Sequence, residues 1–386
     1  MTMTDITPAP KRLASLDALR GFDMFWIMSG EQIIHTLARV TGWTPLVWMS
    51  GQLHHTIWNG FTFYDLIFPL FLFIAGVSMP FSLEKKIWKA GVHSAAELPW
   101  DIKKQQYLSM VRRTLILIVL GMVVNGLLKW NGYENIRFAS VLGRIGLAWF
   151  FAGVIFLNFD IRGQLLWFVG LLLGYWAAMT FIPVPGYGAG VLTMDGSLES
   201  YLDRLLLPGR LHDRIHDPEG ILSTIPAIGT ALLGAFTGRF LQLPSSRLTP
   251  FMKGLVMAGA GIVLLGLALG WGVLFPINKR LWTSSFVLYT GGWSLLLLSL
   301  FYIVIDVGGW KKWSIPFIWI GTNSILIYMA SEAALINFGF TADTLFGGLI
   351  RFAPLPWQPV WTAISVTLVQ LAFLYFLYRN KLFLKI

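Results

Sequence analysis

Ten stretches of this 386-residue sequence are about 20 residues long and mostly apolar, the length that a helix needs to cross a bilayer. A soluble chain of this size could not bury so much apolar surface. Only 12% of the residues are charged, where soluble domains carry roughly 25%. The sequence therefore predicts an all-α, polytopic membrane helix bundle. We expect its ten spans at about 16–38, 62–83, 110–129, 138–159, 163–183, 221–241, 253–275, 282–306, 314–338 and 358–379.

The distribution of lysine and arginine predicts the orientation of the bundle. Ten spans place both termini on one side, which then carries 18 basic residues against nine on the other side. Cytoplasmic loops are the ones enriched in such residues, so we expect both termini in the cytoplasm. Residues 1–15 lack the pattern of a secretory signal peptide and are expected to form a cytoplasmic tail. A single transmembrane domain would then cover 16–386, with its longest outward-facing loop at 184–220.

Several classes of function are excluded or disfavoured by residue content. The sequence has no cysteine, which rules out disulfides, thiolate metal ligands and a cysteine nucleophile. The motifs of phosphate-binding loops, dinucleotide-binding folds, serine hydrolases and zinc proteases are missing. His212 and His216 have a spacing that could hold a metal, but no HExxH motif accompanies them, and no metal is expected. The net charge of +10 is spread over loops at the membrane face, so nucleic acid is not an expected partner.

Ionisable residues inside predicted spans are costly and are functional candidates by default. Asp17 and Arg20 lie three residues apart and can form an ion pair on one helix face. His35 follows Glu31 by four residues and can pair with it in the same way. For Glu31 and Glu332, which lie deeper, structural pairing and a direct function both stay open.

A polar loop precedes the second predicted span. His54 and His55 are followed by Trp58 and Asn59, and the span opens with Asp65. Histidine is the side chain best suited to move protons near neutral pH. The pattern alone leaves two interpretations, a catalytic histidine and one that only hydrogen-bonds the loop.

A basic segment at 84–113 follows the second span. Positive-inside topology with binding of anionic membrane lipid explains it, and so does an anchor for a phosphorylated cytoplasmic substrate. The basic residues of this segment are Lys85, Lys86, Lys89, Lys103, Lys104, Arg112 and Arg113.

Six short blocks, in chain order, resemble the heparan-α-glucosaminide N-acetyltransferase family of transmembrane enzymes. The longest block runs from His55 to Gly76 and contains Trp58-Asn59-Gly60 and Asp65. The other blocks begin at Ser15, Ser140, Asp217, Pro276 and Gly321, so the resemblance covers nearly the whole chain.

The resemblance implies an acyltransferase that takes acetyl-CoA as co-substrate from the cytoplasm. The acetyl group would pass to the amino group of a glucosamine on the far side of the membrane. It also implies that His55, not His54, is catalytic, and it favours a homodimer. Two departures concern the acceptor: the chain reads Met28-Ser29-Gly30-Glu31 where the family has an asparagine, and Ser331 where a histidine precedes the glutamate matching Glu332. We therefore expect free glucosamine or a short amino-sugar oligosaccharide as acceptor, and a bacterial inner membrane as location.

These considerations assign a role to each candidate residue. His55 would remove the proton of the sugar ammonium or accept the acetyl group itself, and Asp65 would orient it. The acceptor would be bound by Trp58, Asn59, Asp217, Glu219, Asn323 and Glu332, and CoA by Lys85, Lys86, Arg112, Arg113 and Arg144. Two other functions stay open: a secondary transporter of a sugar or organic anion, and an O-acyltransferase acting on envelope glycans.

Overall fold

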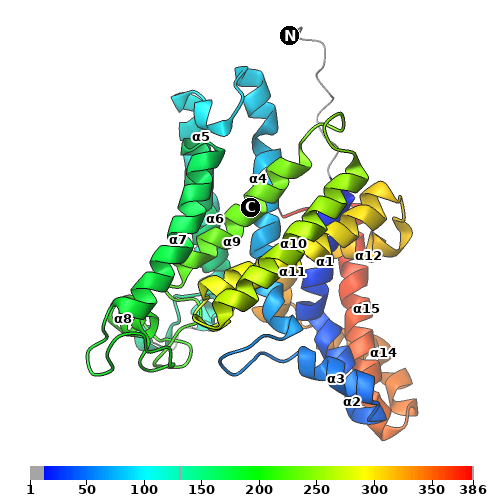
Figure 1. The fold of residues 1–386 in the computed structure, drawn as a ribbon. Coiled ribbons are helices and arrows are strands. Elements are labelled where there is room, and N and C mark those ends of the chain that lie inside the picture. The colour runs from blue at the N-terminus through cyan, green and yellow to red at the C-terminus, as the bar shows by residue number, and fades with distance from the viewer. Residues whose placement is uncertain (1–12, 130–131, 385–386) are drawn as a thin grey trace. The chain divides into compact units, whose positions relative to one another are not determined.

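The computed structural model describes residues 13–129 and 132–384, apart from the side chain of Lys85. These residues form helices and loops with no β-strand among them (Figure 1), which confirms the all-α class. The chain divides into two compact units, which are described separately below. Among the described residues, the first consists of Leu13, 68–129 and 132–303, and the second of 14–67 and 304–384.

The first unit contains the helices from the middle of the chain. Most of them begin where a hydroxyl or carboxylate caps the free backbone N–H groups, as Ser140, Asp160 and Thr283 do. Its helices are α4 (Ile67–Ala90), α5 (Trp100–Val124), α6 (Val141–Asn158), α7 (Ile161–Phe181), α8 (Leu198–Leu206), α9 (Thr224–Leu241), α10 (Pro250–Gly272) and α11 (Ser284–Phe301).

The second unit joins the start of the chain to its end. A π-helical turn, Trp26–Gly30, separates α1 from α2, and a second one, Tyr302–Val307, follows α11. A 3-10 turn, Phe63–Leu66, leads into α4. The helices of this unit are α1 (Ala14–Phe25), α2 (Glu31–Thr41), α3 (Thr44–Gln52), α12 (Ile315–Thr322), α13 (Ser324–Glu332), α14 (Phe338–Phe352) and α15 (Gln358–Arg379).

Helices cover all ten stretches that the sequence predicts as spans. Within the described residues, eight helices are long and apolar enough to cross a membrane by themselves. A ninth span results if Lys312–Thr322 and Ser324–Glu332, which meet at an angle of 66°, count as one broken helix. The predicted span at 16–38 is helical as well, but its charged and polar residues make it too polar to be counted with the others.

Close contacts between helices depend on glycine in both units. A Cβ atom on Gly76 of α4 would lie 2.1 Å from the carbonyl oxygen of Ala231 on α9. In the second unit, a Cβ atom on Gly321 of α12 would lie 1.9 Å from the carbonyl oxygen of Asp17 on α1. Small residues allow backbones to approach in this way, which is how helices associate in a membrane.

Candidate functional site

The loop of residues 53–62, here called the His55 loop, connects α3 to the 3-10 turn at Phe63–Leu66. Its end is fixed by a capping box, in which Thr62 caps the turn and the Asp65 side chain accepts from the Thr62 backbone N–H at 3.2 Å. The Thr62 hydroxyl also donates to the His54 carbonyl at 2.6 Å. A Thr-x-x-Asp sequence is a local signal for such a cap, so the short-range sequence itself determines this part of the site.

His55 and Asp65 form a hydrogen-bonded pair. Nδ1 of His55 lies 2.8 Å from Oδ1 of Asp65, whose side chain is fully buried, whereas that of His55 is 49% exposed. The other carboxylate oxygen accepts from the hydroxyls of Thr56 and Thr62 at 3.0 and 3.1 Å. A carboxylate with these partners acts as an acceptor, so Nδ1 carries the proton and Nε2 keeps its lone pair. The geometry suits a base or nucleophile whose ring is held in place.

Other residues assigned to the acceptor lie in different places. Trp58 is half-buried and Asn59 is exposed, both on the His55 loop. Asn323 sits at the break between α12 and α13, and its side-chain amide bonds the backbone of Leu382 and Leu384 at 3.0 and 3.1 Å. In this structure the Asn323 amide holds the C-terminal segment of the chain, and its assignment to the sugar or the oxyanion stays a prediction.

Polar residues of the first predicted span also have identifiable partners. Nη1 of Arg20 lies 3.6 Å from Oδ1 of Asp17, which confirms the predicted ion pair. Nδ1 of His35, however, lies 2.7 Å from the Ser50 hydroxyl, and its ring stacks on His54 with centroids 4.4 Å apart. His35 thus contacts α3 and the His55 loop, while Glu31 acts on it electrostatically without forming a salt bridge among the described residues.

Tyr64 is a site residue that the sequence did not single out. Its ring packs against His55 with centroids 4.7 Å apart, and it lies close enough to Glu31 to interact with that carboxylate. The position of Tyr64 directly before Asp65 was the sequence signal that could have identified it as a site residue. Glu31 begins α2, while Glu332 ends α13 and is exposed.

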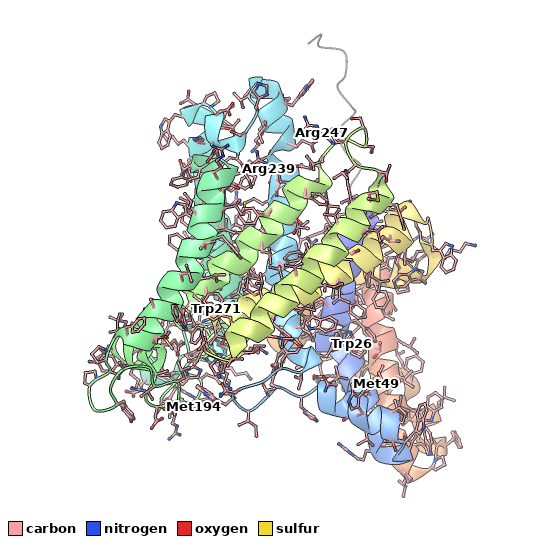
Figure 2. The ribbon with its side chains drawn as sticks, in the orientation of Figure 1. Trp26, Met49, Met194, Arg239, Arg247 and Trp271 are labelled. Atoms are coloured by element: carbon pink, nitrogen blue, oxygen red, sulfur yellow. The ribbon has the colours of Figure 1, made fainter. Side chains whose placement is uncertain are left out.

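A small aromatic pocket of about 260 Å³ lies against the His55 loop. Trp26 and Met49, both labelled in Figure 2, line it together with Phe22, Phe63 and Leu53. Leu53 lies two residues before His55 and Phe63 two residues before Asp65, so both ends of the His55 loop contribute to the lining of this pocket.

In the first unit, Asp217 and Glu219 are bound to a single arginine. Nε and Nη2 of Arg137 donate to the two oxygens of Asp217 at 2.8 and 2.6 Å, and Nη2 also bonds Glu219. Burial alone would raise the pKa of Asp217, but the bonds to Arg137 outweigh it and lower that pKa below its ordinary value. Both carboxylates, predicted to bind the acceptor, thus serve an internal ion pair.

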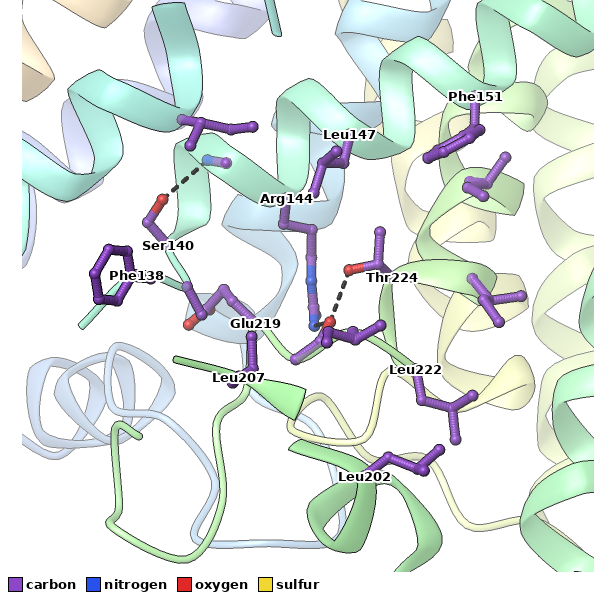
Figure 3. Close-up of a pocket in the computed structure, with 17 residues that line it drawn as sticks. Phe138, Ser140, Arg144, Leu147, Phe151, Leu202, Leu207, Glu219, Leu222 and Thr224 are labelled. Atoms are coloured by element: carbon purple, nitrogen blue, oxygen red, sulfur yellow. Dashed lines mark hydrogen bonds between the residues drawn. The ribbon is translucent and has the colours of Figure 1, made fainter. Parts of the chain in front are cut away.

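Arg144 lies in the first turn of α6 and is 2% exposed. Figure 3 shows its side chain beside Glu219 and Thr224, and its Nη2 donates to the carbonyl of Gly220 at 3.2 Å. It lines an apolar pocket of about 500 Å³ formed by α6, α9 and the segment 202–222. Its hydrogen-bond partners come from residues 220–223 and not from the basic segment 84–113, and its assignment to CoA stays a prediction.

Three more ionisable groups of the 184–220 loop are buried close by. Burial raises the pKa of Glu199 to about 7 and that of Asp203 to about 8, and the two carboxyl groups are close enough to affect each other's titration. Burial lowers the pKa of His216 to about 4. Nδ1 of His216 lies 3.0 Å from Glu199 and 2.9 Å from the Ser200 hydroxyl. At neutral pH the histidine is therefore neutral, and the two carboxyl groups share a proton.

This buried acid pair predicts a pH dependence of stability. An unfolded aspartate ionises near pH 4, whereas Asp203 keeps its proton to about pH 8 in the folded protein. Over that interval the unfolded state binds fewer protons, so the free energy of unfolding falls as the pH rises. We expect Asp203→Asn to flatten the decline of the melting temperature in detergent between pH 6 and 8.5. Asp195→Asn, at an exposed position of the same loop, is the control; an unchanged slope in Asp203→Asn would contradict the shared proton.

The basic residues predicted to bind CoA are distributed over two helices. The segment 84–113 is mostly helical, since α4 reaches Ala90 and α5 begins at Trp100. Lys86 is half-buried on α4, and Arg112 is exposed on α5. The guanidinium of Arg113 lies 4.2 Å from the ring centre of Trp149 on α6. The side chain of Lys85 lies outside the described residues.

The apolar helices and the polar loop with a histidine–aspartate pair define an integral membrane protein with a candidate proton-transfer site. No protein-family model matches the chain. The chain is similar to the human heparan-alpha-glucosaminide N-acetyltransferase, with 29% identity over 99% of this chain and 62% of the human protein. The mouse enzyme of the same name is 29% identical over 86% of this chain and 56% of its own length. The chain thus spans about three-fifths of the curated relatives that it matches.

Proposed function

We propose that the protein is a membrane acetyltransferase. It uses acetyl-CoA to N-acetylate glucosamine or a glucosamine-terminated saccharide. The observation that carries this proposal is the His55–Asp65 pair, in which a fully buried carboxylate is hydrogen-bonded to Nδ1 of a half-exposed histidine. The similarity to two N-acetyltransferases supports the type of group that is transferred.

The proposed reaction needs only the groups at the His55 loop and two substrates. The acceptor nitrogen attacks the thioester carbon, the new C–N bond forms, and the C–S bond breaks. Before the attack the acceptor ammonium gives one proton to Nε2 of His55, which later releases it to solvent. After the attack the nitrogen loses a second proton, which the leaving CoA thiolate takes up to become the free thiol. Asp65 stabilises the histidinium that forms in between. A route through an acetyl group on Nε2 uses the same geometry.

The orientation of the enzyme is part of the proposal. The excess of basic residues on one side supports cytoplasmic termini in a bacterial inner membrane and an acceptor on the outer face. Lys85, Lys86, Arg112 and Arg113 would then attract the phosphates of CoA from the cytoplasm. We also propose that membrane lipid surrounds the apolar helices and that the enzyme acts as a homodimer.

The decisive test supplies purified protein in detergent with acetyl-CoA and measures free CoA with a thiol reagent. We expect CoA release that depends on added glucosamine and yields N-acetylglucosamine. N-acetylglucosamine itself, which has no free amine, should release none. CoA release with N-acetylglucosamine would indicate an O-acyltransferase, and no release with any sugar would favour a transporter.

A further inference from the structure

The apolar pocket beside Arg144 has no role in the proposed reaction. Its volume is about 500 Å³, within the range of ligand pockets in proteins. Side chains from α5, α6, α9 and the segment 202–222 form its wall, and Figure 3 shows Leu147, Phe151 and Leu222 among them. All three helices are long and apolar enough to cross a membrane. A pocket between such helices is filled from the bilayer, so we expect its occupant to be a lipid.

The wall of the pocket changes from polar to apolar along the axis of α6. Arg144 lies in the first turn of α6, and Thr224, which also lines the pocket, begins α9. Phe151 follows Arg144 by seven residues and lies about 10 Å deeper, at 1.5 Å per residue. It is exposed on a helix that can cross the membrane, so this end of the pocket faces lipid. A glycerolipid has the same gradient, with ester groups near the membrane surface and acyl chains below them.

Arg144 also has hydrogen-bond donors that the described residues do not use. The residue is 2% exposed, and its Nη2 atom donates to the Gly220 carbonyl and the Ser223 hydroxyl. The guanidinium lies over the ring of Trp282, 5.1 Å from its centre. Nε and Nη1, however, have no hydrogen-bond partner in the described part of the chain. Because a buried donor without an acceptor is unfavourable, a bound molecule that supplies an oxygen acceptor here is stabilised.

The charges around the pocket favour a neutral acceptor over an anion. Glu219 lines the pocket beside Arg144 (Figure 3) and is bonded to Arg137. Ser223, the hydroxyl partner of Arg144, also donates to the buried Glu199. A carboxylate or phosphate at Arg144 would therefore lie next to existing acidic groups. An ester carbonyl accepts from Nε or Nη1 without adding negative charge.

We infer that this pocket is a binding site for a diacyl glycerolipid of the membrane. One acyl chain lies along the apolar wall formed by α6 and α9, and its ester carbonyl accepts from Nε or Nη1 of Arg144. The lipid thereby fastens the segment 202–222 to both helices. In this inference the unused donors of Arg144 serve lipid and not CoA. Lipid binding does not depend on acetyl transfer, since His55 and Asp65 take no part in it.

The first test compares two lipids on the purified full chain, stripped of lipid in detergent. Native mass spectrometry counts the bound molecules and gives a dissociation constant for each. The probes are dioleoyl phosphatidylethanolamine and its diether analogue, which lacks both ester carbonyls. We expect one site of the wild-type protein to prefer the diester by about 10-fold or more, the usual effect of a hydrogen bond to a charged donor. Arg144→Lys keeps the charge but not the guanidinium donors, so the preference should fall below about threefold.

A second variant tests the pocket even if Arg144→Lys fails to fold. Leu147→Trp puts a larger side chain into the pocket wall, and we expect it to remove the preferred lipid site. Leu166→Trp is the matched control, because Leu166 lies on α7, is 75% exposed and does not line the pocket. It should keep the preferred site with an unchanged dissociation constant. Melting temperatures in detergent show which variants are folded.

Several results would overturn the inference. Equal affinity of the wild-type protein for the diester and the diether, which needs no variant, would rule out the carbonyl contact. A preferred site that persists in folded Leu147→Trp would place the lipid elsewhere. Tighter binding of oleate than of the diester would identify an anionic ligand instead. Displacement of the lipid by acetyl-CoA would return Arg144 to CoA.

Discussion

Replacing His55 with alanine should lower the rate of acetyl transfer to glucosamine by about 10²- to 10⁴-fold, the usual contribution of a general base. The residue combines a ring held at Nδ1 by Asp65 with a side chain that is half exposed. Without His55 the acceptor amine stays protonated, because no other histidine among the described residues of this loop is paired with a buried carboxylate. Single-turnover transfer of radiolabelled acetyl measures the chemical step directly.

The adjacent histidine provides the control for this experiment. His54 stacks on His35, and its carbonyl accepts from Thr62, so its side chain has only a packing contact. His54→Ala should retain transfer within a few-fold of the wild-type rate, and His55→Ala should still bind acetyl-CoA. If His55→Ala kept more than about a tenth of the activity, it would not act as base or nucleophile.

Asp65→Asn should have the second largest effect, a loss of roughly 10²-fold or more in kcat. An asparagine can present its NH₂ group to Nδ1, which would then act as an acceptor and leave the proton on Nε2, the atom that must be free. The substitution also removes the charge that stabilises the histidinium. The expected signature is a lower kcat, with KM for acetyl-CoA unchanged.

Stability must be measured beside activity in this case, because Asp65 is fully buried and accepts from Thr56 and Thr62. Thr56→Val removes one of these donors but leaves the carboxylate on His55, and it should cost less than 10-fold in kcat. A folded Asp65→Asn protein with more than a third of the wild-type kcat would show that the carboxylate does not control the tautomer.

The helices were predictable because each span is a long apolar run in the sequence, independent of the helices that pack against it. The π turns at Trp26–Gly30 and Tyr302–Val307 were not, since one extra residue in a turn leaves the hydropathy unchanged. The bend at Asn323 was hidden for the same reason, because apolar residues continue on both sides of it.

The candidate site was predictable only where its contacts are local. Asp65 follows His55 by 10 residues, and the loop between them ends in a capping box whose Thr-x-x-Asp pattern is visible in the sequence. Arg144 bonds a carbonyl 76 residues away, and Asn323 bonds one 59 residues away. Those pairings depend on how helices pack, so residue type and position could not assign their partners.

The π-helical turn before Glu31 also fixes the direction in which that carboxylate points. Successive residues of an α-helix are rotated by about 100° around its axis. A turn that accommodates one extra residue places Glu31 at the angular position around the axis that the preceding residue would have in an unbroken helix. Removing one residue from Trp26–Gly30 would leave every polar side chain of the span in the sequence and still swing Glu31 away from Tyr64. The angular phase of this helix thus decides which neighbours the Glu31 carboxylate meets.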